Sequence, residues 1–180
     1  MNRLIITIAI VTILASCNPT NKKANKMEEQ KNETANAIST NDTTPKVTGI
    51  GGIFFFSDNP KETKEWYRKN LGLETNEYGS SFESRDVNRP QEINTLQWCP
   101  FKTGSEYFAP SKKEFMINYR VQNIEGLVKK LKEKGTTILD SIATFDYGKF
   151  VHIIDPEGNK IELWEPIDSV SAAKDGKTTK

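Results

Sequence analysis

The sequence predicts an α+β domain in which a strand–helix–strand–strand–strand unit occurs twice. Three features indicate this: a strand-like run before each of two amphipathic helices, helix caps at matching places, and a C-terminal hairpin at residues 150–166. Because each unit buries one face of its strands under its helix, the remaining faces of the two units can enclose a cleft.

The C-terminal hairpin turns at Asp155–Gly158, which places proline second and glycine where a positive φ costs little. A short turn makes His152 and Glu162 neighbours on one face. An imidazole beside a carboxylate favours a functional site, while a solvated sheet face is the alternative interpretation.

The first unit starts with the apolar run Gly51–Phe56. A helix follows, capped by Asp58 or Asn59, and Gly72 predicts its end. The clearest of the later strands is Asn94–Cys99.

The second unit starts with Phe115–Val121, which alternates between apolar and polar residues as a half-buried strand does. Asn123 can cap a second helix, and Gly135 predicts its end. Strand residues continue over 136–145 and into the hairpin. The apolar positions of this helix are Ile124, Leu127, Val128 and Leu131.

A constant offset overlays the two units, matching Gln97 with Glu162 (162 − 97 = 65) and Gly51 with Met116 (116 − 51 = 65). Strand alternation then assigns a face to each position. The predicted helix-facing positions are Gly52, Phe54, Phe56, Ile117, Tyr119, Val121, Ile161 and Leu163. The predicted cleft-facing positions are Gly51, Ile53, Gln97, Cys99, Met116, Asn118, Arg120, His152, Glu162 and Trp164.

Composition excludes several classes of protein. The formal net charge is +1 and no basic stripe exists, so nucleic acid is not an expected partner. Two cysteines, Cys17 and Cys99, are too few for a disulfide framework. The single histidine, His152, limits metal chemistry.

The N-terminal segment, residues 1–17, has a positive start and a short apolar run typical of an export signal. Leu14-Ala15-Ser16-Cys17 resembles the lipobox of bacterial lipoproteins, which implies a lipid on Cys17 and a membrane anchor in the cell envelope, outside the cytoplasm. An ordinary secretory signal is the alternative.

Polar segments flank the predicted domain on both sides. Residues 18–46 hold almost no large apolar side chains, which predicts a disordered tether, and residues 167–180 predict a flexible tail. The domain is therefore expected at 47–166, with modules at 47–101 and 115–166.

Three stretches carry a resemblance to a known family: G-I-G-G-I-F-F-F-S-D-N-P, M-I-N-Y-R-V-Q-N-I, and D-P-E-G-N-K-I-E-L-W-E-P. Together they resemble the vicinal oxygen chelate superfamily, which contains glyoxalases, fosfomycin- and bleomycin-resistance proteins and extradiol dioxygenases. The resemblance implies paired βαβββ modules that form a U-shaped mixed sheet around a central cleft, with helices on the outer face.

In metalloenzymes of this family the ligand positions correspond here to Gly51, Gln97, Met116 and Glu162. Glu162 alone is an ordinary ligand for a hard divalent metal, and Gln97 is a weak oxygen donor. His152 could complete a reduced set. We therefore expect a cleft without a cofactor, with a divalent metal as the alternative.

The cleft residues also suggest how a small molecule would bind. Glu162 and His152 can act as an acid–base pair, and Arg120 can hold an anionic substrate. The predicted ligand-binding residues are Gln97, Met116, Asn118, Arg120, His152 and Trp164.

Two interpretations of function follow. The first is a lipid-anchored domain that binds a small polar or aromatic molecule in a metal-free cleft. The second is a metal-dependent lyase or dioxygenase of the same family, centred on Glu162. A structural envelope protein is a third alternative. Both modules lie in one chain, so a monomer can close its own cleft, and a homodimer is compatible with the family resemblance.

Overall fold

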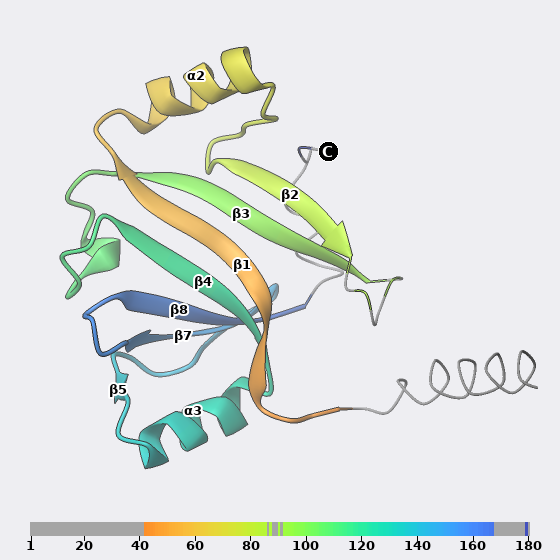
Figure 1. Ribbon diagram of the computed structural model, residues 1–180, viewed down its shortest axis with the longest axis vertical. Coiled ribbons are helices and arrows are strands. Elements are labelled where there is room, and N and C mark those ends of the chain that lie inside the picture. The colour runs from red at the N-terminus through yellow and green to blue at the C-terminus, as the bar shows by residue number, and fades with distance from the viewer. Residues whose placement is uncertain (1–41, 86, 88–89, 91, 168–178, 180) are drawn as a thin grey trace, which may run out of the picture. The chain divides into compact units, whose positions relative to one another are not determined.

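The computed structural model describes residues 42–85, 87, 90, 92–167 and 179 of the chain. Its strands join in one sheet of the order β2-β3-β1-β4-β8-β7-β5, with β6 paired to β7 (Figure 1). The strands are β1 (Lys46–Ser57), β2 (Ser80–Arg85), β3 (Ile93–Lys102), β4 (Phe115–Gln122), β5 (Thr137–Ile138), β6 (Ala143–Phe145), β7 (Gly148–Ile154) and β8 (Lys160–Pro166). The helices are α2 (Pro60–Leu71), α3 (Ile124–Glu133) and the short η1 (Glu106–Phe108).

The sheet consists of two halves with the same pairing pattern. β1 and β4 pair antiparallel at its centre, and each has a parallel neighbour on its other side, β3 for β1 and β8 for β4. Antiparallel strands β2 and β7 follow on the outside. The predicted repeat and the α+β class of the fold are confirmed. In the first half an isolated bridge between Thr75 and Ser80 precedes β2.

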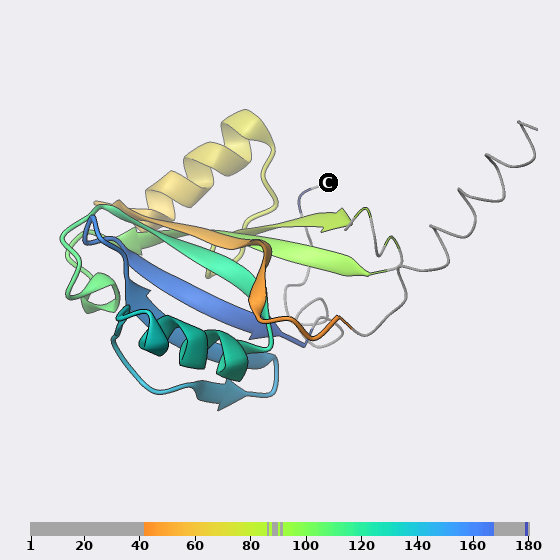
Figure 2. The ribbon, with the colours of Figure 1, turned by 60° about the horizontal axis from the view of Figure 1, so that its bottom comes forward.

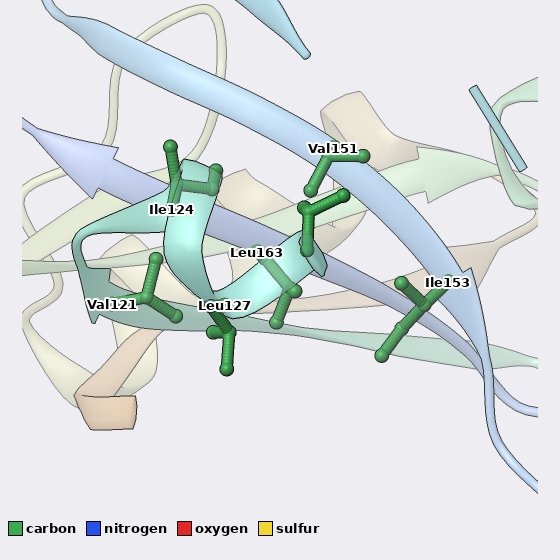
Figure 3. Close-up of a cluster of buried hydrophobic side chains, with 7 residues drawn as sticks. Val121, Ile124, Leu127, Val151, Ile153 and Leu163 are labelled. Carbon is green, nitrogen blue, oxygen red and sulfur yellow. The ribbon is translucent and has the colours of Figure 1, made fainter. Parts of the chain in front are cut away.

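Helix α3 covers the second half of the sheet and forms its main core (Figures 2 and 3). Ile124 is fully buried, and Leu127 and Val128 are nearly so, as their helical spacing predicts. They pack against Val151 and Leu163 of the hairpin strands. Burial of these side chains holds the hairpin in place beside β4.

Helix α2 contacts the first half of the sheet more loosely. It starts at Pro60, where Asn59 accepts a hydrogen bond from the Glu62 amide at 3.3 Å, and Gly72 ends it in the left-handed conformation. No residue of α2 is buried. Its main contact with the sheet is the ring of Tyr67, 4.6 Å from that of Trp98.

The two faces of the sheet differ in composition. The strand register places an apolar row on one face, formed by Trp98, Ile53, Ile117 and Ile161. Both helices contact this face, because Tyr67 of α2 packs on Trp98 and the α3 cluster takes in Ile161. The prediction that the helices lie on one outer face is confirmed, and the opposite face is left for a site.

Strand β1 corrects the predicted facing of its residues. Its register against β4 shifts twice, so that Thr48 and Gly51 are extra residues with no direct partner. Each such bulge reverses the alternation that follows it. The two reversals cancel beyond Gly51, and the register pairs Ile53 with Ile117 on the helix-covered face. The predicted helix-facing residues Gly52, Phe54 and Phe56 therefore lie on the other face.

The described segment before β1, residues 42–45, is hydrogen-bonded to the end of β4 and the start of α3. Side-chain amides of Gln122 and Asn123 donate to backbone carbonyls of residues 42–44 and hold this segment. At the other end, the Thr179 amide donates to the Ser81 carbonyl at 2.8 Å. Among the described residues no helix is long and apolar enough to cross a bilayer.

Candidate functional site

A row of small and polar residues crosses six strands on the face away from the helices. Each member pairs with the next in the strand register, so their side chains share one line. The row is Ser81, Gln97, Gly52, Asn118, Glu162 and His152. The predicted pairing of His152 with Glu162 is confirmed.

The Glu162 carboxylate is the most heavily hydrogen-bonded group in this row. It is 3% exposed. Its Oε1 accepts a hydrogen bond from Asn118 Nδ2 at 2.6 Å, and its Oε2 accepts one from the hydroxyl of Tyr107. His152 Nε2 lies 2.9 Å from the same Oε2. These donors replace water around a carboxylate that burial would otherwise destabilise.

His152 lies between two carboxylates. Its Nδ1 is 2.6 Å from Asp140 Oδ2, and its backbone amide donates to Asp140 Oδ1 at 2.8 Å. Burial acts to lower the pKa of His152, but the hydrogen bonds to Glu162 and Asp140 outweigh it and raise that pKa above 6.5. The chain Glu162–His152–Asp140 thus connects the buried carboxylate to the half-exposed Asp140.

A cavity of about 490 Å³ opens over this row. Its volume falls within the range of small-molecule sites, about 300–1,000 Å³. Aromatic rings dominate the wall: Phe54, Tyr78, Phe101, Tyr107, Tyr147, Phe150 and Trp164. The remaining lining residues are Gly51, Asn76, Gln97, Cys99, Asn118 and Glu162.

The aromatic wall is built from stacked pairs. Phe150 and Trp164, neighbours across the hairpin, stack with ring centroids 5.8 Å apart and an interplanar angle of 9°. Phe101 and Tyr107 stack at 5.2 Å. Tyr107 comes from η1, in the connection between the two halves, and its burial next to Glu162 raises its pKa, so it stays a hydrogen-bond donor.

Glycine at position 51 makes room for the cavity wall. A Cβ there would lie 2.1 Å from Asn118 Oδ1 and 2.9 Å from Trp164 Cε3. Asn118 is 2% exposed, and its Oδ1 has no hydrogen-bond partner among the described residues. A buried unpaired acceptor costs free energy, on the order of 1–3 kcal/mol.

The structure brings together most of the predicted site residues. Gln97, Asn118, Glu162 and Trp164 line the cavity, and His152 contacts Glu162 behind the lining.

Two predicted ligand-binding residues lie elsewhere. Met116 is fully buried in a cluster with Phe54 and Phe108 and does not line the cavity. Arg120 is 4% exposed, and its guanidinium lies 5.1 Å from the ring centroid of Trp164 and donates to the Thr95 carbonyl at 3.4 Å. The predicted lipidation site, Cys17, lies outside the described residues.

The register also corrects the equivalence between the two halves. Gln97 is the parallel neighbour of Gly52, and Glu162 is the parallel neighbour of Asn118. Gly52 therefore corresponds to Asn118, and the predicted match of Gly51 with Met116 is wrong. The difference arises because Gly52 precedes Gln97 by 45 residues (97 − 52 = 45), whereas Asn118 precedes Glu162 by 44 (162 − 118 = 44), so one offset cannot match both pairs.

A divalent metal does not fit the residues at this place. The four equivalent positions supply one carboxylate, two amides and a glycine. The Glu162 carboxylate already accepts hydrogen bonds, and both ring nitrogens of His152 face carboxylates. Within the described part of the chain, no group of three His, Cys, Asp or Glu side chains could hold a metal ion.

Cys99 lines the cavity as a protonated thiol. Its Sγ donates to the Tyr78 carbonyl at 2.7 Å, and burial raises its pKa to about 11. A thiol of this pKa is a poor nucleophile at neutral pH.

Sequence reasoning missed several residues of the site. Tyr107, Tyr147 and Asp140 lie in η1 or in connections between strands, where no periodicity assigns a side chain to a face. Phe150 could have been assigned to the site from the sequence. It lies two residues before His152 on the same strand, so the two side chains point to the same face of the sheet.

The sequence profile of the "Glyoxalase/Bleomycin resistance protein/Dioxygenase superfamily" matches residues 49–163. That match covers the hydrogen-bonded row and every residue that lines the cavity except Trp164. No curated protein matches this sequence at a significant level.

Solved structures share the fold at low sequence identity. A Streptomyces coelicolor methylmalonyl-CoA epimerase variant superposes with a TM-score of 0.51 at 15% identity, covering 68% of this chain and 99% of its own. The Mycobacterium tuberculosis methylmalonyl-CoA epimerase gives 0.47 at 18% identity, covering 76% and 99%. A superfamily member from Vibrio splendidus gives 0.42 at 14% identity, covering 68% and 99%. At these identities the likeness concerns the fold.

Proposed function

The chain belongs to the Glyoxalase/Bleomycin resistance protein/Dioxygenase superfamily, and from this premise we propose that its cavity binds a small aromatic or polar molecule without a metal ion. The observation that carries the proposal is the cavity wall itself. Stacked rings and the hydrogen-bonded side chains of Asn118 and Glu162 line it together.

Several physical reasons support an aromatic ligand. Planar rings stack on rings, and each aromatic pair contributes about 0.5–1.5 kcal/mol beyond area burial. Stacking holds the rings of the wall parallel in two pairs, Phe150 with Trp164 and Phe101 with Tyr107. Because these side chains are already ordered, little side-chain entropy is lost when a ligand binds. A few polar groups at the floor would then orient the ligand.

Ligand-dependent melting of the full chain, purified in mild detergent, tests the proposal. Phenol, indole and benzimidazole at millimolar concentration should raise the melting temperature, because a ligand that binds only the folded state stabilises it. The rise should disappear in Phe150→Ala, which removes one wall, and persist in Phe115→Ala, a half-exposed ring on the opposite face. Equal rises in both variants would refute binding in the cavity.

Metal-free proton transfer is a second candidate, favoured by the chain Glu162–His152–Asp140. A carboxylate that lines a cavity and contacts an imidazole can exchange a proton with a bound carbon acid. The test is deuterium uptake from heavy water into a panel of carbon acids that bind the full chain. Uptake that is equally fast with Glu162→Gln would contradict this role.

We further propose that Cys17 carries a lipid anchor and that the domain lies in the cell envelope, outside the cytoplasm. The lipobox-like sequence before Cys17 supports this. Labelled palmitate should enter the wild-type chain in a bacterial host, and the Cys17→Ser variant should remain unlabelled. Label in the variant would contradict anchoring at Cys17.

A further inference from the structure

The only charged side chain among the described residues that line the cavity is an acidic one. Glu162 is its only ionisable group of either sign apart from tyrosine and cysteine, and no lysine, arginine or histidine appears among the described lining residues. Glu162 and Asp140 face the two ring nitrogens of the same imidazole, so within the group Glu162–His152–Asp140 two carboxylates share one titratable cation. A negatively charged ligand would meet this charge in a poorly solvated space.

Two cations on neighbouring strands are directed to other partners. The Arg120 guanidinium packs on Trp164 and donates to the Thr95 carbonyl. Lys160 Nζ donates to the Tyr107 carbonyl at 2.6 Å and lies 5.2 Å from the Tyr107 ring centroid. Neither side chain lines the cavity. An anionic group in the cavity would therefore lose its hydration without gaining a cation.

Acceptors are in excess at the cavity floor. The side-chain amide of Asn118 donates from Nδ2 to Glu162, and its Oδ1 has no hydrogen-bond partner among the described residues. Glu162 can offer only acceptor atoms when ionised. A ligand that supplies an N–H or O–H group can donate to the Glu162 carboxylate, whereas one that supplies only acceptors cannot.

From these observations we infer that the ligand is a planar aromatic molecule that carries an N–H or O–H donor and no negative charge, so that neutral and cationic rings bind and carboxylate- or phosphate-bearing ones do not. The inference rests on the proposed function and narrows its ligand class. Cations gain in addition from the electron-rich face of Phe150, which lines the cavity.

A matched series on one ring tests the inference: tryptamine, indole, indoleacetate and N-methylindole, which differ in charge or in the N–H donor. Each is titrated into isotope-labelled full chain in detergent, and Kd is taken from the amide shifts of Gly51, Gly52 and Glu162. Tryptamine and indole should bind. Indoleacetate should bind at least about tenfold more weakly than indole, which corresponds to about 1.4 kcal/mol, and N-methylindole about threefold to tenfold more weakly.

The Glu162→Gln variant tests whether the charge of Glu162 causes the weak binding of indoleacetate. Glu162→Gln keeps the shape of the side chain and removes its charge, so indoleacetate should come within about threefold of indole in that variant. Comparable binding of indoleacetate and indole to the wild-type chain would overturn the inference while leaving aromatic binding intact. Failure of all four compounds to shift any cavity amide would overturn both the inference and the proposed function.

Discussion

Gly51 lies in β1 close to the side chains of Asn118 and Trp164. Gly51→Ala would place a methyl group 2.1 Å from Asn118 Oδ1, so Asn118 and its hydrogen bond to Glu162 must move. We expect a loss of about 1–3 kcal/mol in the free energy of unfolding, together with loss of indole binding. Chemical denaturation and a ligand titration measure the two effects.

Gly49 provides the matched control on the same strand. A Cβ there would meet only Arg120 Cδ, at an ordinary 3.9 Å. Gly49→Ala should therefore change the free energy of unfolding by less than about 1 kcal/mol and leave binding intact. Equal effects of the two substitutions would show that Gly51 has no special role.

His152 is the only histidine of the chain, so its ring resonances report directly on the site. Its pKa should exceed 6.5, because hydrogen bonds to Glu162 and Asp140 stabilise the imidazolium. Glu162→Gln should lower that pKa. A proton NMR titration measures both values, and a wild-type pKa below 6.5 would contradict the described contacts.

The raised pKa of His152 also fixes the sign of a pH effect on stability. The folded state holds the proton more tightly than the unfolded state, so the stabilisation is complete below about pH 6.5 and is lost as the pH rises through the folded-state pKa. The free energy of unfolding should fall across that window in the wild-type chain. The fall should shrink in Glu162→Gln, as urea denaturation at several pH values would show.

The neighbouring pair His152 and Glu162 could be predicted from the sequence, because a tight turn fixes the register of a hairpin. Their partners could not. Tyr107 is 55 residues from Glu162 in sequence, and Asp140 lies in a connection before β6. Contacts of this kind depend on how connections fold back over the sheet, which local periodicity does not encode.

At the scale of elements, α3 and α2 have different roles in stability. Ile124→Ala in α3 should cost about 2–5 kcal/mol, because the side chain is fully buried against the hairpin strands. Leu71→Ala in α2 removes a side chain that is 59% exposed and should cost less than about 0.5 kcal/mol. Thermal or chemical denaturation of both variants checks the contrast, and similar costs would contradict the assigned packing.

The elements themselves follow from sequence patterns. Caps at Asn59 and Asn123, glycines at helix ends and the alternation of Phe115–Val121 predict the observed helices and strands. The bulge at Gly51 could not be predicted, since an extra residue in one strand is defined by its partner. The predicted face of Phe54 and the predicted counterpart of Gly52 were wrong for another reason: the offset between the two units is 66 at Gly52 (118 − 52 = 66) and 65 at Gln97 (162 − 97 = 65).

At the scale of the whole domain, the repeat explains why the site lies where it does. Equal pairing in the two halves brings four equivalent strands, β1, β3, β4 and β8, to the centre of the sheet. Their equivalent positions carry Gly52, Gln97, Asn118 and Glu162, which favour hydrogen bonding to a small molecule over metal coordination.

Titration of the full chain with indole in the presence of excess chelator tests the central claim most directly. The account predicts saturable binding that is unchanged by the chelator, shifts the amides of Gly52 and Glu162, and is lost in Gly51→Ala. Binding that disappears with the chelator and returns with a divalent metal, or that survives unchanged in Gly51→Ala, would contradict it.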